Sequence, residues 1–499
     1  MNHITNVGII ACIAVIEFCA CAHKFVGPTE PVTLDDAYYN LTRNLMSELE
    51  QFRGKSFKRD ITVVTYTENE YMTIVADEMN AISEEYKKLA NDIWIRENFL
   101  RPGTDYFDGY DSIMSSMVGG FYKEGTDTIS LIIENGATSI SHYDTMAVFH
   151  ELVHALQDQY FDLEKLHDDV VFSDESYSLQ YIIEGEAELF TLYFEYKSVI
   201  GYYPQTPVPI VDILNSVNSD VEEDINSRHA SGEPLFRLLP MLWGYYSYGP
   251  LFINEVTMGD WSKIDDRVFV TMPHKTLEVM NPFYYLTNRK EYFLNLQLFL
   301  ETLNASQEIL DFDELGYMLT CVMLREWDIA NWQYSHTGIQ ADNIIAYRSS
   351  DTDSLRLIWY TKWDGTPNPD FMAAYREIIM KKRNLVLPAP VTSGSYTFVN
   401  DTLHNIYLEQ LDSTVIILED YIPEYLDNWL NRLHQAKSYQ LSAALAKPLN
   451  TRQYPRVDKT TLARVWPRKS FGFGQKKYGN EFTLYSGYVS PPRCRSGTK

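Results

Sequence analysis

Two histidines four residues apart, with a glutamate directly after the first, are the residues in this sequence best suited to chemistry. They are His150, Glu151 and His154, in the segment FHELVHALQDQ (149–159). On a helix, both imidazoles would point the same way one turn apart, so both could bind one Zn²⁺ at about 2.0–2.1 Å. Glu151 would then reach a zinc-bound water and act as a general base. The spacing predicts a metal site with hydrolytic chemistry.

A zinc site also needs a third protein ligand, and a later acidic cluster supplies candidates. The apolar segment YIIEGEAELFTLYF contains Glu184, Glu186 and Glu188. Glu184 and Glu188 are four residues apart, and two carboxylates on one buried face need a compensating cation or donor. We therefore expect Glu184 to bind the metal and Glu188 to accept a hydrogen bond from His150. Glu186 is expected to point elsewhere. The alternative is an exposed acidic stripe.

Other residues are expected to support this group. Asp158 follows His154 by four residues, so the two side chains could be in contact. Gly185 and Ala187 would allow the helix that carries the glutamates to approach the histidine helix closely.

Acyl transfer also needs a group that stabilises the oxyanion. Tyr248 and His274 are candidates for this role. Packing is the alternative for each of them, since tyrosine is abundant here, with 36 residues. His142 and His167, which flank the motif, are expected at helix ends or on the surface.

The HExxH segment, followed by Glu-x-x-Ala-acid on a second helix, resembles the gluzincin class of metallopeptidases. In thermolysin-like members, an acid at the position of Asp158 supports the site. The resemblance implies a zincin-like catalytic domain, with zinc on His150, His154 and Glu184 and with Glu151 as the general base.

A closer resemblance is to a group of bacterial exported proteins, often lipoproteins, that are classed as metallopeptidases. Their pattern of GFY, HELxHALQDQ and EGEA occurs here in the same order, and the likeness covers about residues 60–390 without the C-terminal tail. The matching blocks are GGFYKEGTDTISLI (119–132), HELVHALQDQYFDL (150–163), IIEGEAELF (182–190), YGPLFINEVTMGDWSKIDD (248–266), MPHKTLEVMNPFYY (272–285), DNIIAYRS (342–349) and RLIWYTKWD (356–364).

Composition narrows the classes of partner. The 499 residues are 45% hydrophobic and 14% aromatic, as in folded globular proteins. The net charge of -26 argues against nucleic acid and against loose adhesion to anionic membranes. The sequence contains no G-x-S-x-G elbow, Walker loop or G-x-G-x-x-G after a strand.

The N-terminus resembles an export signal. VGIIACIAVI (7–16) is an apolar run too short to span a bilayer but long enough for a signal-peptide core. Ala20 before Cys21 resembles a bacterial lipobox, in which the cysteine is lipidated. The segment departs from that pattern at Phe18 and in lacking an early Lys or Arg. We expect export to the cell envelope, facing the periplasm or exterior, with a lipid on Cys21. A plain cleaved signal or a short anchor is the alternative.

Cysteine usage agrees with an exported protein that does not depend on disulfides. Cys12, Cys19 and Cys21 lie in the leader, which leaves Cys321 in an apolar stretch and Cys494 in the tail. A cysteine-based metal site is therefore excluded, and a structural bridge is not expected.

Periodicity and turn residues predict the elements that position the site. The TISLII strand of the predicted hairpin is expected to lie along the cleft and to pair with an extended peptide. Helices are predicted at 34–54, 69–100, 141–161 and 175–199, strands at 60–67, a strand pair at 119–136, a loop or insertion at 204–228, mostly helix over 235–379 with short strands near 356–364, and a hairpin within 394–420.

These elements predict an α+β, predominantly helical protein. Residues 451–499 contain 11 Lys and Arg but only 2 Asp and Glu. We expect this basic segment to be a flexible or peripheral extension. The expected divisions are 1–21 leader, 22–203 catalytic domain, 204–234 insertion, 235–390 helical region completing the cleft, 391–450 hairpin plus helix, and 451–499 basic tail.

The function expected from these features is that of a zinc metallopeptidase that acts on peptide or protein substrates, with one zinc ion. Two alternatives stay open. One is a non-catalytic zincin-like binding module at the cell surface. The other is a zinc amidohydrolase that acts on a cell-wall component.

Overall fold

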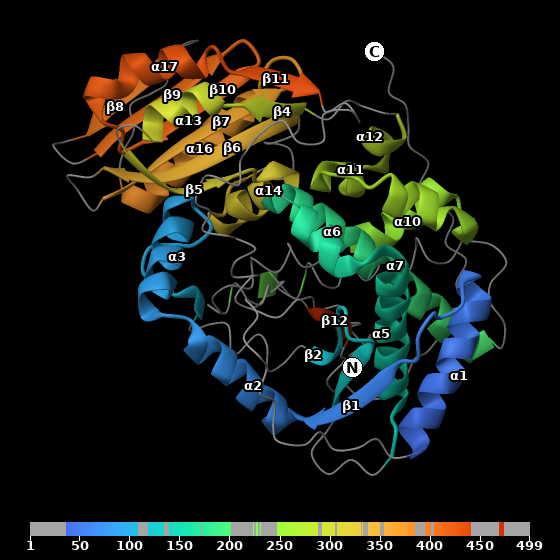
Figure 1. Ribbon diagram of the computed structural model, residues 1–499. Helices are drawn as coiled ribbons and strands as arrows, with labels where there is room; N and C mark the ends of the chain where they lie inside the picture. The colour runs from blue at the N-terminus through green and yellow to red at the C-terminus, as the bar shows by residue number, and fades with distance from the viewer. Residues whose placement is uncertain are drawn as a thin grey trace, which may run out of the picture.

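The computed structural model shows a mixed α+β architecture, which confirms the expected fold class (Figure 1). The leader with Cys21, and Cys494, lie outside the described residues. Most of the expected 204–228 loop does too, although Glu223, Asn226 and Ser227 within it are helical. The described residues are 36–107, 118–133, 139–170, 172–200, 223, 226, 227, 230, 247–287, 292–304, 307–330, 332, 338–349, 354–384, 395–400, 404–440 and 469–473.

The first part of the chain builds the helices and strands around the HExxH segment, and most of them match the expected positions. The helix expected at 69–100 is two helices, because Ser83 caps the second one by accepting a hydrogen bond from the Tyr86 N–H at 3.2 Å. In chain order the elements are α1 (Asp36–Arg53), β1 (Thr62–Thr67), α2 (Glu68–Ala81), α3 (Glu84–Arg96), β2 (Val118–Lys123), β3 (Thr128–Ile133), α5 (His142–Phe161), α6 (Leu163–Asp169) and α7 (Ser173–Ile200).

A four-stranded sheet lies against α5, in the order β1-β3-β2-β12, where β12 is Lys469–Phe473. β1 is parallel to β3, and the other neighbours are antiparallel. Because β3 lies between two strands, the expectation that TISLII is an open edge strand is wrong. The outer edge of β2 is also paired, because β12 from the basic extension places Ser470 opposite Tyr122 (Figure 1).

The later part of the chain contains more strand than expected. The strand expected near 356–364 is confirmed as β7, but the expectation of mostly helix over 235–379 is wrong from β5 onward, since β5, β6 and β7 join β8, β9 and β10 in one six-stranded sheet. The elements are α10 (Gly249–Thr257), η2 (Trp261–Lys263), η3 (Asp265–Val270), α11 (Thr276–Met280), α12 (Pro282–Leu286), β4 (Tyr292–Asn295), α13 (Gln297–Asn304), β5 (Gln307–Asp313), α14 (Gly316–Glu326), β6 (Ile339–Ser349), β7 (Leu355–Trp363), α16 (Pro369–Arg383), β8 (Ser395–Asn400), β9 (His404–Leu411), β10 (Thr414–Glu419), η5 (Pro423–Tyr425), α17 (Leu426–Leu433) and β11 (Lys437–Gln440).

The six-stranded sheet is ordered β5-β6-β7-β10-β9-β8 and separates two hydrophobic cores. On β6, Ile344 and Ala346 belong to the core shared with α7, whereas Ile345 and Tyr347 belong to the core under α13 and α17. A strand buried on both faces is a continuous apolar run without polar alternation. The sequence of β6 therefore resembles a buried helix. The hairpin expected within 394–420 is present as β9 and β10, and it belongs to a larger sheet because β10 also pairs with β7.

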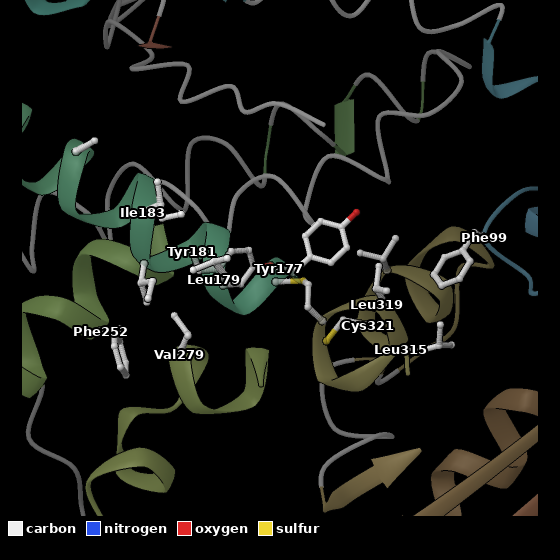
Figure 2. Close-up of a cluster of buried hydrophobic side chains, with 14 of the residues drawn as sticks. Phe99, Tyr177, Leu179, Tyr181, Ile183, Phe252, Val279, Leu315, Leu319 and Cys321 are labelled. Atoms are coloured by element: carbon white, nitrogen blue, oxygen red, sulfur yellow. The ribbon is translucent and has the colours of Figure 1, made fainter. Parts of the chain in front are cut away.

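The main core surrounds α7. Figure 2 shows side chains of α7, α10, α11 and α14 gathered in one cluster, among them Tyr181, Phe252, Val279 and Cys321. Cys321 on α14 is buried and is not part of a disulfide, as its apolar surroundings in the sequence predicted. The core thus holds α7, and with it the acidic cluster, against its neighbouring helices.

Candidate metal centre

The HExxH segment lies within α5, a helix whose N-terminus is capped by its own side chains. Ser141 and Asp144 form a capping box, in which Ser141 Oγ accepts from the Asp144 N–H at 3.0 Å and Asp144 Oδ2 accepts from the Ser141 N–H at 2.7 Å. Nearly every residue from Asp144 to Gln159 is buried. The polar groups of the motif are therefore removed from water, at a cost that partners must offset.

The second helix of the centre, α7, packs against both α5 and α10. A Cβ on Gly185 would lie 2.5 Å from the carbonyl carbon of Gly249, and a Cβ on Gly249 would lie 2.0 Å from the Tyr181 carbonyl oxygen. Gly185 therefore does allow close helix packing, but its partner is α10 rather than α5. This contact brings the start of α10 beside Glu184.

Three side chains from α5 and α7 converge. Glu184 Oε2 lies 3.2 Å from His150 Nε2 and 3.3 Å from His154 Nε2. The two imidazole rings are 4.8 Å apart between centroids. All three side chains are fully buried, and their ligand atoms lie within 4.8 Å of one another. In the described part of the chain, this is the group of histidine and acidic side chains that could hold a metal ion.

The spacing suits a tetrahedral ion. Ligands at about 2.0–2.1 Å from a tetrahedral centre are separated by roughly 3.3 Å, and the two distances from Glu184 Oε2 are close to this value. The arrangement can therefore receive an ion without a large movement of these side chains.

The two histidines and Glu184 shift one another's pKa values. Burial lowers the pKa of His154, but Glu184, Glu151 and Gln157 together outweigh burial and raise it to about 9. Burial raises the pKa of Glu184, yet the two histidines lower it to about 2. The pKa of His150 is lowered, chiefly by burial. Glu184 is thus an ionised carboxylate in a dry site, stabilised by one positive charge, and a metal cation can supply that charge instead of a proton.

Glu151 is fully buried beside this group. Burial raises its pKa well above the usual range, while the charge on His154 lowers it and that on Glu184 raises it. Neither carboxylate oxygen has a hydrogen-bond partner of normal geometry among the described residues. The backbone N–H of Tyr122, on β2, is close enough to lower its pKa. A carboxylate held in this way is suited to exchanging a proton with a bound molecule.

The residue that orients His154 is Gln157, which sequence reasoning missed. Its Oε1 lies 3.0 Å from His154 Nδ1. The expected partner, Asp158, has a different role, because it accepts hydrogen bonds from the Tyr122 hydroxyl at 2.8 Å, the Gly125 N–H at 2.8 Å and the Leu163 N–H at 3.0 Å. Asp158 therefore ties the β2–β3 turn to the end of α5. Gln157 follows His154 by three residues on α5, so helical spacing alone could have identified it.

The remaining acidic residues also differ in role. Glu188 Oε2 lies 3.9 Å from His150 Nδ1, too far for the expected hydrogen bond. Glu184 is steadied by Gln180, which donates to its Oε1 at 3.0 Å. Gln180 Oε1 in turn lies 3.2 Å from His167 Nε2. His167 lies in the last turn of α6, as one of the two expectations for it had it, and its side chain is only 9% exposed, so it is not a surface residue.

The two oxyanion candidates are placed differently. Tyr248 immediately precedes Gly249, so the packing of Gly249 on Gly185 places its backbone beside the turn of α7 that carries Glu184. His274 pairs with Glu175 at 3.0 Å, near the start of α7 and about 13 Å of helix rise from the ligand on that helix. The structure therefore places the backbone of Tyr248 against the helix that carries Glu184, and it places His274 near the start of that helix. His142, the first residue of α5, is exposed as expected.

No helix in the described part of the chain is long and apolar enough to cross a bilayer. No model of a known protein family matches the chain, and neither a curated protein nor a solved structure matches it.

Proposed function

We propose that the chain is a zinc-dependent metallopeptidase with its metal on His150, His154 and Glu184. The observation that carries the proposal is the convergence of these three buried side chains beside Glu151, whose oxygens have no hydrogen-bond partner of normal geometry in the described part of the chain. Two imidazoles and one carboxylate are the ligand set of several catalytic zinc sites. A structural zinc site has four protein ligands and needs no adjacent base, so the intact Glu151 favours catalysis over a binding module.

The roles of the residues follow from their positions. Bound zinc would polarise the substrate carbonyl and lower the pKa of a coordinated water. Glu151 takes a proton from the attacking water and returns it to the leaving amine. Gln157 and Gln180 hold His154 and Glu184 in place. Tyr248 is the proposed donor to the developing oxyanion, since its helix packs on Gly185 beside Glu184.

Export remains part of this proposal. The apolar run at 7–16 and the Ala20-Cys21 pair support a signal sequence and a lipid anchor. Extracytoplasmic proteins or peptides would then be the substrates.

The test is a comparison of wild type with Glu151→Gln for zinc content and for cleavage of a diverse peptide mixture. We expect one zinc per chain in both proteins, with kcat/KM lower by about 10²–10⁴-fold in the variant. Equal cleavage by a zinc-loaded Glu151→Gln protein would refute the role of Glu151. A wild type that binds zinc and cleaves cell-wall amides but no peptide would favour the amidohydrolase alternative.

A further inference from the structure

The contacts of Gln157 lead from the metal ligands into a chain of buried polar side chains. Its Nε2 donates to the Ile183 carbonyl oxygen and to Glu186 Oε2, both at 2.9 Å. Because both amide hydrogens are used in this way, the amide presents Oε1 to His154 Nδ1 at 3.0 Å. The opposite orientation would place the amide oxygen against two other acceptors. The orientation of Gln157 is therefore determined by its partners.

This orientation decides which nitrogen of His154 carries the hydrogen. An amide oxygen only accepts, so His154 Nδ1 must be the donor. In the neutral ring the lone pair is then on Nε2, the nitrogen that lies 3.3 Å from Glu184 Oε2. Gln157 thus selects the tautomer in which His154 can bind a metal through Nε2.

Glu186 is in turn held by Arg53 of α1. Arg53 Nε donates to Glu186 Oε1 at 2.6 Å, and its Nη2 donates to Asp265 Oδ1 at 2.6 Å. The side chains of Arg53 and Glu186 are 3% and 2% exposed. Arg53 thus fixes one oxygen of the Glu186 carboxylate, Oε1, and leaves the other, Oε2, to accept from Gln157.

We propose that Arg53 is a positioning residue for the metal ligand His154, acting through Glu186 and Gln157. This inference rests on the proposed metal site and extends it to α1, which supplies none of the three ligands. Without the guanidinium, the Glu186 carboxylate loses the donor that fixes its Oε1 and can turn away from the amide of Gln157. The amide could then turn and offer an N–H to His154 Nδ1, which would move the ring hydrogen to the metal-binding nitrogen.

The experiment measures zinc affinity by competition with a chromogenic chelator, and needs no enzymatic activity. The variants are Arg53→Met, Arg53→Lys, Glu186→Gln and Gln157→Leu. We expect Arg53→Met and Gln157→Leu to weaken zinc binding by about 10- to 100-fold. Glu186→Gln should weaken it too, because its amide can donate to Gln157. Arg53→Lys should recover part of the affinity, since it keeps a cation beside Glu186.

Two other arginines provide matched controls. Arg43→Met changes the same helix, α1, but at an exposed residue that pairs with Asp60. Arg383→Met removes a largely buried guanidinium that pairs with Glu419 and Asp420, on the six-stranded-sheet side of the molecule. Neither should change zinc affinity by more than about twofold, even where stability falls.

A second readout reports the tautomer directly. In zinc-loaded protein, ¹⁵N NMR of the histidines should show a slowly exchanging Nδ1–H for His154 in wild type. This hydrogen should exchange faster in Arg53→Met, whereas it should be unchanged in Arg383→Met. If Arg53 had a purely structural role, the exchange rate of the His154 Nδ1–H would not differ between Arg53→Met and Arg383→Met.

A folded Arg53→Met protein with wild-type zinc affinity and a wild-type His154 signal would overturn the positioning role. If Arg53→Met does not fold, Glu186→Gln and Gln157→Leu decide on the same two measurements. The outcome is separable from the proposed function. A wild type that binds zinc but cleaves no peptide removes the peptidase proposal alone, whereas an active enzyme that is indifferent to Arg53 and Gln157 removes this inference alone.

Discussion

Gly185 on α7 and Gly249 on α10 meet backbone to backbone, with no room for a side chain between them. Alanine within a helix is normally about 1 kcal/mol more stable than glycine. At this contact the sign reverses, because the new Cβ would lie 2.5 Å from the Gly249 carbonyl carbon. We expect Gly185→Ala to lower the free energy of unfolding by about 1–3 kcal/mol and to weaken zinc binding through Glu184. Urea denaturation checks this, and equal or greater stability would contradict the packing.

Zinc should stabilise the folded protein, because its ligands converge only in the folded state. At free zinc 100 times above Kd, the gain is about 2.7 kcal/mol, visible as a rise in thermal midpoint that a chelator reverses. Glu184→Gln should abolish most of this rise. The matched variant Glu188→Gln should retain it, because Glu188 lies 3.9 Å from His150 and not at bonding distance. A zinc response lost equally in both variants would contradict the assignment of Glu184 as ligand.

A buried acidic cluster at the start of α7 should make stability depend on pH. Burial raises the pKa of Asp174 to about 7 and that of Glu314 to about 8, although Lys275 opposes both shifts. Asp342 is also raised by burial, and Lys275 opposes that shift too. Between about pH 4 and pH 8 the folded protein therefore binds more protons than the unfolded chain. The free energy of unfolding should fall as the pH rises through this window.

The matched variant for this cluster is Asp174→Asn. Its amide oxygen can still accept from the Thr276 N–H, which lies 3.1 Å from Asp174 Oδ1, but it needs no proton. Urea denaturation from pH 5 to pH 9 should show a shallower decline for Asp174→Asn than for wild type. Parallel curves for the two proteins would show that Asp174 does not carry the pH dependence.

The strand pair of β2 and β12 predicts an effect of the C-terminal extension on activity. An extended peptide that adds to the outer edge of β2 must first replace β12 there. Removing residues 441–499 should therefore raise kcat/KM for extended peptides, by roughly 10-fold if the edge is free one-tenth of the time. A chain cut after residue 473 retains β12 and should behave as wild type. Equal kinetics for all three chains would mean that peptides do not bind at this edge.

The metal ligands could be predicted from sequence because helical spacing fixes which side chains share a face. His150 and His154 needed only that rule, and Glu184 was indicated by the cost of a carboxylate among apolar residues. The supports were harder to predict. Arg53 reaches Glu186 across 133 residues, and no local pattern reports such a contact. Asp158 has helical spacing to His154, yet the turn after β2 offers it better donors.

In the sheets too, some strands could be predicted from the local sequence, whereas other features depend on residues far away in the chain. The β2–β3 hairpin was predictable because its strands flank a short turn with glycine. The strand near 356–364 was predicted and is β7, whereas β6 was missed because both of its faces are buried and it lacks polar alternation. The pairing of β1 with β3 needs a crossover through α2 and α3, so the partner of β1 lies far away in the chain.

The late position of β12 in the chain has a consequence for biosynthesis. Lys469 pairs with Lys123, so the sheet beside α5 stays incomplete until synthesis has passed residue 473, long after the metal ligands on α5 and α7. Every nascent chain that ends before this strand exposes the outer edge of β2, and open strand edges readily pair with other chains. The C-terminal strand therefore closes an aggregation-prone edge, and a ribosome that stops early would release a chain with all its metal ligands and an unprotected sheet.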